Sequence, residues 1–145
     1  MVRRLLVAGL WLVEMSRQEY LRRMPRWLSI RVGVDHWAIR DLMETAGRAV
    51  REHDLVLDAG AGECQYRSFF RHARYVAVDF ARGDSTWNYS CLSVIGDLVR
   101  LPVADSVFDA ALCTQVLEHV NEPKQVVGEM SRVLRPGGQL FVSVP

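Results

Sequence analysis

The chain has 145 residues, of which 50% are hydrophobic and 24% are charged, and its formal net charge at pH 7 is +1. A chain of this length can bury the core of one domain but not of two. The near-neutral charge argues against a large phosphate-binding surface, so nucleic acid is not an expected partner.

The amino-terminal third differs from the rest in charge. Residues 1–33 hold seven arginines and two glutamates, a net charge of +5. Their apolar run Leu5–Val13 is far shorter than the roughly 20 residues that cross a bilayer. We therefore expect a basic helical extension, followed by one domain over 34–145. The extension either caps that domain, which we favour, or meets an anionic membrane through its arginines with Trp11 and Trp27.

A glycine turn follows the first predicted strand of the domain. Helical spacing of apolar residues over Trp37–His53 predicts a helix that leads into a strand beginning at Leu55. That strand continues into Val56–Glu63, in which Gly60 and Gly62 permit positive-φ turns and close approach of a ligand to the backbone. The run indicates a site for a nucleotide-like cofactor.

Dinucleotides and S-adenosylmethionine are the two candidate cofactors for such a turn. The dinucleotide pattern needs a third glycine or alanine at the position that Gln65 occupies. Glu63 would also place a negative charge beside two phosphates, whereas it suits a cationic sulfonium and ammonium. Asp58, just before the turn, can reach that ammonium directly or through water. These details favour S-adenosylmethionine.

The next two predicted strands each end beside an acidic residue. Tyr75–Asp79 is an apolar strand whose terminal carboxylate can accept both hydroxyls of a ribose. After a loop or short turn over residues 81–91, Leu92–Ile95 forms the third strand. Asp97 with the neighbouring backbone can then hold an adenine ring. Between the first two strands, apolar spacing over Tyr66–Ala73 predicts a crossover helix.

The fourth and fifth strands are separated by a second clear helix. Phe108–Cys113 is the fourth strand, and the segment Thr114–His119 that follows it faces the reaction side. Pro123 suits the first turn of a helix, which Pro136–Gly138 ends, and the fifth strand is Gln139–Pro145. Alternating strands and helices predict an α/β fold with a mainly parallel sheet.

Four ordered motifs resemble those of class I S-adenosylmethionine-dependent methyltransferases of the type 11 group, which includes C-methyltransferases of ubiquinone and menaquinone biosynthesis. The motifs are Val56–Glu63, Ala77–Phe80, Ile95–Asp97 with Leu101–Asp109, and Val116–Val120 with Leu134–Gly138. Together they cover about Asp54 to Pro145. The resemblance implies a Rossmann-like doubly wound sheet of strand order 3-2-1-4-5. It also implies a C-terminally incomplete domain, because the family continues with a helix and two more strands.

The resemblance also assigns candidate site residues. The cofactor-binding set is Asp58, Ala59, Gly60, Gly62, Asp79, Phe80, Asp97, Leu98 and Gln115. The methionine moiety is assigned to the acid and the glycines of the turn, the ribose to Asp79, and adenine to Asp97 and Leu98. Many members have a further glycine where this chain has Cys64. No metal is expected, and no residue is assigned as a catalytic base.

The expected activity is transfer of a methyl group from S-adenosylmethionine to a small-molecule or lipid-like acceptor. A cofactor-binding fragment without catalysis and, less favoured, a nicotinamide-dependent oxidoreductase remain the alternatives. The three cysteines lack the spacing of paired metal ligands, which argues against a disulfide framework or a structural zinc and favours a reduced, cytoplasmic setting. Cys113 is expected to be a core residue, and His119 is as well suited to packing as to contact with the acceptor.

Overall fold

The computed structural model describes residues 4–7, 10–13, 34–83 and 85–145, with side chains from residue 37 onward. The chain divides into two compact units, residues Met1–Ala38 and Ile39–Pro145. The expected boundary between the extension and the domain, after residue 33, lies a few residues before this division.

The first unit contains two short strands where a helix is predicted. Strands β1 (Arg4–Val7) and β2 (Leu10–Val13) pair antiparallel, with Leu5 opposite Leu12. Two apolar runs separated by Ala8 and Gly9 have the pattern of a hairpin, so the helical prediction is wrong over these eight residues. Most of the basic extension lies outside the described residues, so its contact with a membrane stays a prediction.

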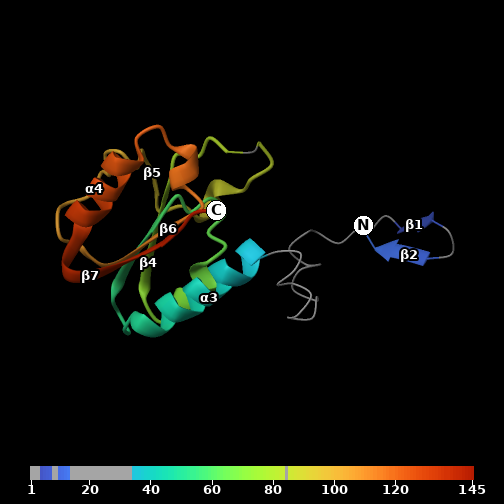
Figure 1. Ribbon diagram of the computed structural model, residues 1–145, viewed down its shortest axis with the longest axis horizontal. Coiled ribbons are helices and arrows are strands. Elements are labelled where there is room, and N and C mark those ends of the chain that lie inside the picture. The colour runs from blue at the N-terminus through green and yellow to red at the C-terminus, as the bar shows by residue number, and fades with distance from the viewer. Residues whose placement is uncertain (1–3, 8–9, 14–33, 84) are drawn as a thin grey trace. The chain divides into compact units, whose positions relative to one another are not determined.

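The second unit is built on a five-stranded parallel sheet (Figure 1). Its strand order is β5-β4-β3-β6-β7, and every neighbouring pair runs parallel. The strands are β3 (Leu55–Ala59), β4 (Arg74–Asp79), β5 (Val94–Ile95), β6 (Phe108–Thr114) and β7 (Leu134–Ser143). Counted within the domain, this is the predicted order 3-2-1-4-5, which confirms the Rossmann-like α/β class.

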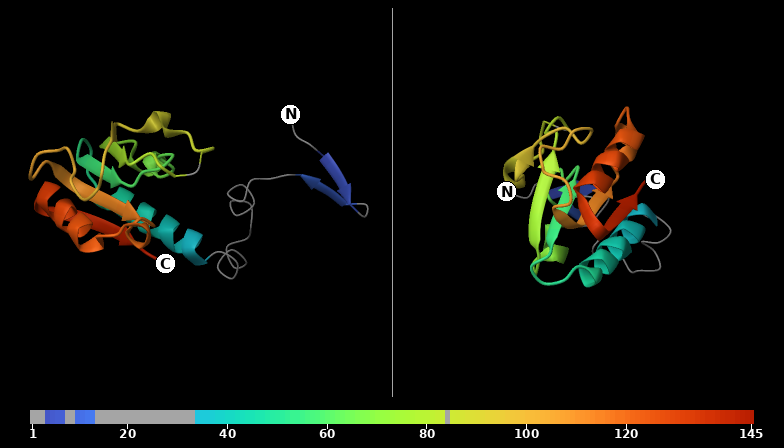
Figure 2. Two further views of the ribbon diagram at one scale, coloured as in Figure 1. Left: turned by 90° about the horizontal axis from the view of Figure 1, so that it is seen from above. Right: turned by 90° about the vertical axis from the view of Figure 1, so that its left-hand side faces the viewer.

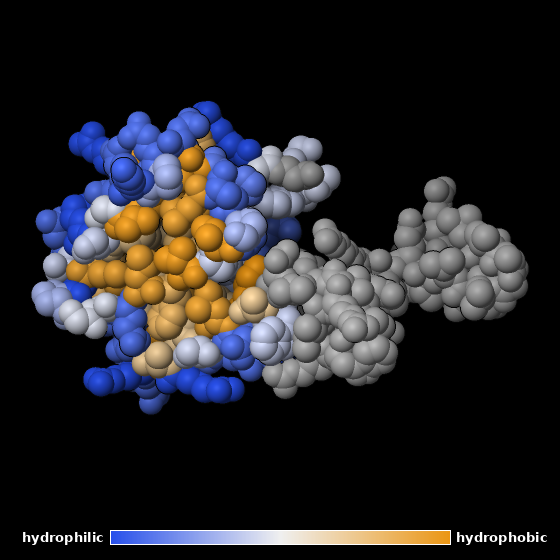
Figure 3. All heavy atoms as spheres, in the orientation of Figure 1, coloured by the Kyte–Doolittle hydropathy of each residue, from blue (hydrophilic) through white to orange (hydrophobic). Residues whose placement is uncertain are grey.

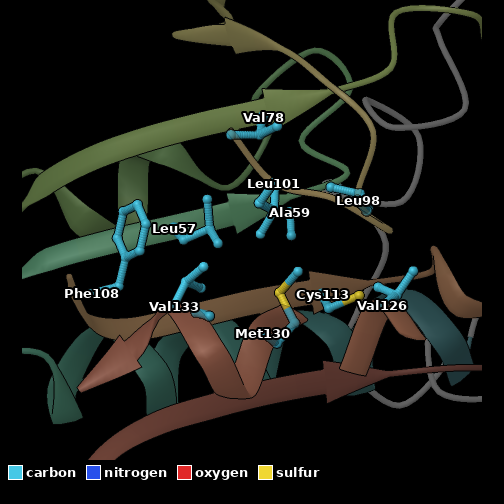
Figure 4. Close-up of a cluster of buried hydrophobic side chains, with 11 residues drawn as sticks. Leu57, Ala59, Val78, Leu98, Leu101, Phe108, Cys113, Val126, Met130 and Val133 are labelled. Carbon is cyan, nitrogen blue, oxygen red and sulfur yellow. The ribbon is translucent and has the colours of Figure 1, made fainter. Parts of the chain in front are cut away.

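Two helices cover opposite faces of this sheet (Figure 2). Because side chains alternate along β3, Val56 faces α3 (Val34–Ala49), whereas Leu57 faces α4 (Pro123–Val133). On the α4 side, Figure 4 shows Phe108 and Met130 within a continuous apolar cluster. The helices predicted over Trp37–His53 and after Pro123 are therefore present, and both pack their apolar stripes on the central strands.

The crossover between β3 and β4 contains less helix than predicted. Only a single 3-10 turn, η1 (Arg67–Phe70), forms where a helix is expected over Tyr66–Ala73. Phe70 is nevertheless buried and packs with the partly buried Tyr66 and Tyr75 against α3. The second crossover has the predicted short form, with η2 (Tyr89–Cys91) between β4 and β5.

An arginine on α4 organises the segment between β5 and β6. Arg132 donates to the carbonyl oxygens of Leu101 and Val103, and its guanidinium pairs with Glu129 and Asp105 at 2.7 and 2.6 Å. At the start of β6, Asp109 accepts from the amide of Leu55 and pairs with a second arginine. Asp105 and Asp109, the two acids of this motif, therefore have structural roles.

Among the described residues, no helix is long and apolar enough to cross a membrane. On the face drawn in Figure 3, apolar residues gather across the middle and hydrophilic residues lie above and below them. Large apolar side chains that remain exposed include Phe80, Trp87 and Ile95. All three follow or end strands β4 and β5, on the side of the sheet edge where the candidate site lies.

Candidate functional site

The predicted site residues gather at one edge of the sheet. Because β3, β4, β5 and β6 are parallel, their carboxyl ends meet at the same edge, where doubly wound sheets bind ligands. From β3, the chain continues to β4 and β5 on one side of that strand and then crosses to β6 and β7 on the other side. The carboxyl ends of β3 and β6 therefore form a topological switch point, where the direction of strand order reverses. The segments that line it are 58–64, 79–83, 96–98 and 114–119.

Gly60 adopts a conformation that suits glycine, with φ of +82°. Its amide donates to the carbonyl oxygen of Val78 at 2.8 Å, which holds the start of the turn against β4. A Cβ at this position would lie 2.3 Å from a methyl carbon of Val116. Position 60 therefore requires glycine for two reasons: its positive φ and the lack of space for a Cβ beside Val116.

Asp79 connects the end of β4 to the glycine turn. Its Oδ2 accepts a 2.9 Å hydrogen bond from the amide of Gly62, and its Oδ1 accepts one of 2.8 Å from the amide of Ala81. A carboxylate has about four lone-pair sites, so each oxygen can accept a further donor. The side chain is thus positioned between the turn and the site with capacity for two more hydrogen bonds.

Asp58 is buried beneath the glycine turn and is not exposed at the surface of the site. Its side chain is 1% exposed, and Oδ2 accepts from the hydroxyl of Tyr75. Burial raises the pKa of Asp58 to about 6, the Tyr75 hydrogen bond opposes this rise, and the charge of Asp79 adds to it. A cation beside this carboxylate would favour its charged form.

The segment after β5 combines an exposed acid with a buried leucine. Asp97 is exposed, and its Oδ1 accepts a 3.0 Å hydrogen bond from the amide of Val99. Leu98 packs into the core beneath it. The amide of Gly96 donates to the carbonyl oxygen of Asp79 at 3.0 Å. The candidate ribose and adenine residues are therefore brought together.

The other predicted residues differ in their access to the edge. Phe80 is 47% exposed, with the guanidinium of Arg82 4.6 Å from its ring centroid. Gln115 bonds to Ser143 through both its backbone amide and its side chain. Ala59, in contrast, is fully buried in the cluster that faces α4, so its side chain belongs to the core.

A disulfide between Cys64 and Cys91 corrects the expectation of unpaired thiols. It joins the glycine turn to η2, with the two Cα atoms 6.2 Å apart. Spacing along the chain gave no indication of this pair, because the two cysteines are brought together only by the crossover between β4 and β5. Cys113 is the free, buried cysteine.

Two features of the edge were not identified from the sequence. The segment 85–91 lies against the glycine turn: Trp87 comes within 3.5 Å of a Cβ built at Gly62, and the amide of Asn88 donates to Glu63. At the end of β6, Oγ1 of Thr114 is buried and has no hydrogen-bond partner within the described residues. An orphaned hydroxyl at this edge is consistent with a polar ligand.

Cys113 and His119 lie in different surroundings. Burial raises the pKa of the Cys113 thiol to about 11, and Figure 4 shows its side chain beside Met130 and Val126. The cysteine is therefore a core residue, as expected. His119 is exposed at the end of the 3-10 turn η3 (Leu117–His119). Within the described part of the chain, no group of three metal-ligating side chains converges.

Comparisons with known proteins agree with this geometry. A demethylmenaquinone methyltransferase from Mycobacterium marinum is 42% identical over 93 residues, which covers 61% of this chain and 40% of that protein. A proposed methyltransferase from Bacillus halodurans has a TM-score of 0.58 at 28% identity, covering 71% of this chain and 48% of that one. The [4+2]-cyclase SpnF has a TM-score of 0.60 at 27% identity, with 70% and 43% covered.

In each of these comparisons, the match spans less than half of the known protein. The family described as "Methyltransferase domain" matches residues 57–142, which is more than half of this chain. That range begins inside β3, includes the glycine turn and the ends of β4, β5 and β6, and finishes in β7. The chain therefore belongs to the methyltransferase domain family, and its sheet has the class I fold.

Proposed function

We propose that this domain binds S-adenosylmethionine at the carboxyl ends of β3 to β6 and that the protein transfers its methyl group to a small-molecule or lipid-like acceptor. The observation that carries the proposal is the Asp79 carboxylate, which bonds to the amide of Gly62 and keeps acceptor capacity. This carboxylate would accept the ribose hydroxyls beside a turn that a ligand can approach closely. Family membership supports the same cofactor.

The residues of the edge fit the parts of this cofactor. The hydroxyls of the ribose would donate to Asp79, while Asp97 and the backbone near Leu98 would face adenine. The half-exposed ring of Phe80 offers an apolar surface for stacking on the base. The glycine turn would face the methionine moiety, and Asp58 would act on its ammonium from beneath the turn.

The charge of the edge also suits a cationic ligand. Asp58, Glu63, Asp79 and Asp97 all lie on segments that line it, whereas a dinucleotide would bring a pyrophosphate to the same place. The carboxylate of Glu63 is held at this edge by the amide of Asn88 at 3.0 Å. This arrangement supports the sulfonium cofactor over a nicotinamide dinucleotide.

Catalysis would depend mainly on positioning. The bound cofactor supplies an electrophilic methyl group, and the protein would hold an acceptor nucleophile in line with it, an effect worth roughly 7–11 kcal/mol in favourable cases. Gln115 lies after β6, where it would line the acceptor side. The name of the Mycobacterium marinum relative supports an acceptor of the menaquinone-precursor type.

A binding function without methyl transfer is the second candidate. The similarity to a [4+2]-cyclase supports it, because a protein of this fold is named for a different reaction. The result that would identify it is saturable binding of the cofactor without any methylated product.

We propose a cytoplasmic location, with membrane contact through residues 1–33 as a further expectation.

Calorimetric titration with S-adenosylhomocysteine, alongside NADH, tests the proposed cofactor. Saturable binding of the first ligand alone is the expected result, and the reverse preference would support an oxidoreductase. Incubation with radiolabelled S-adenosylmethionine and a demethylated quinone then tests transfer. Absence of binding by folded protein would contradict the proposal.

A further inference from the structure

We propose that the Cys64–Cys91 disulfide controls the affinity of the cofactor site in response to the thiol redox state, an inference that rests on the proposed function. The bridge links residues 27 positions apart. One cysteine lies two residues after Gly62, and the other ends η2 after the long loop from β4. The two sides of the cofactor edge are therefore covalently joined.

The bridge is accompanied by contacts that bring the same two segments together. The amide of Asn88 donates to Oε1 of Glu63 at 3.0 Å, and the ring of Trp87 lies 3.5 Å from the position of a Cβ on Gly62. The sulfur of Cys91 also lies 3.7 Å from the carbonyl oxygen of Gly62. Segment 85–91 is thus held against the turn that would contact the cofactor.

The backbone conformation of Cys64 explains why breaking the disulfide should weaken cofactor binding. Cys64 has a φ of +55°, in the left-handed region that disfavours residues with a Cβ. A glycine at this position would adopt the same conformation without that penalty. The disulfide is one of the restraints that hold Cys64 in this conformation, together with the 2.8 Å hydrogen bond from its amide to the carbonyl oxygen of Ala61. Reduction should therefore release the turn and lower its population in the binding-competent form.

The chemistry is ordinary thiol–disulfide exchange. A thiolate of a dithiol reductant attacks one sulfur of the bridge, the S–S bond breaks, and a mixed disulfide forms with release of the other cysteine as a thiolate, which takes up a proton. The second thiol of the reductant then displaces the remaining protein sulfur. The protein gains two electrons and two protons, and the reductant becomes a cyclic disulfide. Cys91 is partly exposed and offers the accessible sulfur, whereas Cys64 is buried.

In a reducing compartment such as the cytoplasm, such a bridge would act as a switch rather than as a permanent link. Disulfides in that compartment are usually transient and are either catalytic or redox-sensing. Cys113 does not compete for either partner, because it is buried in the core on the α4 side of the sheet. The pair at the cofactor edge is therefore chemically separate from the third cysteine.

The test compares one preparation of the full chain in two redox states. Calorimetry with S-adenosylhomocysteine should show about tenfold weaker binding after dithiothreitol treatment, as expected if roughly one molecule in ten keeps the competent turn. Alkylation of the unfolded protein in urea, followed by mass spectrometry, should count one free thiol before reduction and three after it. Reoxidation should restore the affinity.

Two double variants distinguish loss of the disulfide from the change in backbone conformation at position 64. Cys64→Ser with Cys91→Ser should bind like the reduced parent and no longer respond to dithiothreitol. Cys64→Gly with Cys91→Ser places glycine at the left-handed position, so it should bind like the oxidised parent in both conditions. Circular dichroism checks that each variant folds, and the reduction cycle on the parent needs no variant.

The outcomes distinguish this inference from the function on which it rests. Equal affinities of the oxidised and reduced parent, or three free thiols in the oxidised sample, would overturn the redox inference alone. Failure of the folded, oxidised chain to bind S-adenosylhomocysteine would overturn the proposed function and this inference with it.

Discussion

The amide of Gly62 donates a 2.9 Å hydrogen bond to Oδ2 of Asp79, so the turn after β3 and the end of β4 share one carboxylate. The same carboxylate accepts from the amide of Ala81 through its other oxygen. Asp79 therefore stabilises the shape of the site as well as facing its proposed ligand. A substitution there should affect both.

Asp79→Ala is expected to weaken binding of S-adenosylhomocysteine by at least roughly tenfold, because a hydrogen bond to a charged group contributes about 1.5–3 kcal/mol. Calorimetry measures the change. Asp41→Ala is the matched control, since it removes an exposed acid from α3, far along the chain from the turn. Equal loss in both variants would indicate a general effect of charge and contradict the ribose assignment.

Gly60→Ala should block the turn by collision, because its Cβ would lie 2.3 Å from a methyl carbon of Val116. We expect loss of cofactor binding together with a lower midpoint of thermal unfolding. Adding Val116→Ala removes the two closest methyl groups and should restore part of the stability, while the strain of φ at +82° remains. A Gly60→Ala variant that binds normally would contradict the packing explanation.

Gly128→Ala provides the control for this substitution. Gly128 lies in α4, and nothing lies within 4 Å of a Cβ built there. Alanine is favoured over glycine inside a helix by about 1 kcal/mol, so this variant should be more stable than the parent and bind the cofactor unchanged. Thermal unfolding and calorimetry on the two alanine variants give the comparison.

Asp58→Asn should stabilise the fold at neutral pH and weaken the cofactor complex. The pKa of Asp58 is raised from 3.8 to about 6, so its protonation favours the folded state. This contribution is fully present below about pH 3.8 and is lost as pH rises through about 6. Relative to the parent, the asparagine variant should gain up to about 3 kcal/mol between these limits.

The measurement is the free energy of unfolding from urea titrations between pH 4 and pH 7.5, covering the range around the raised pKa of Asp58. A cationic ligand that lowers this pKa would also release protons when it binds near pH 6. Calorimetry in buffers of different ionisation enthalpy should detect that release for the parent and not for Asp58→Asn. A parent that releases no protons would contradict contact between Asp58 and the ammonium.

Arg132→Lys should lower the midpoint of thermal unfolding while leaving cofactor affinity unchanged. One guanidinium satisfies two carbonyl oxygens and two carboxylates, a geometry that an ammonium cannot reproduce. Thermal unfolding and calorimetry distinguish the two effects. If affinity falls at a temperature where the variant is fully folded, Arg132 affects the site as well as the fold.

The sequence predicted the sheet because its signals are local. The apolar runs ending in Asp58 and Asp79 mark strands by themselves, and Pro123 marks the start of α4 where the structure has it. The first crossover was predicted less well, because the aromatic spacing around Phe70 is satisfied by a single 3-10 turn that buries the same ring.

The site was predicted as a set of positions but not as a set of contacts. The bond of Gly62 to Asp79, the disulfide of Cys64, and the position of Trp87 over the turn all join segments distant in sequence. No spacing rule reports such contacts. Ala59 has its side chain in the core, so its predicted contact with the cofactor would have to come from its backbone.

The contact between Gly60 and Val116 limits how the acceptor side could be redesigned. Val116 lies at the beginning of η3, on the side proposed for the acceptor, and its methyl groups fill the space next to Gly60 in the glycine turn. Replacing it with a larger side chain would push on the turn before any new substrate was bound. Libraries for altered substrate preference should therefore vary the neighbouring positions and keep this valine fixed.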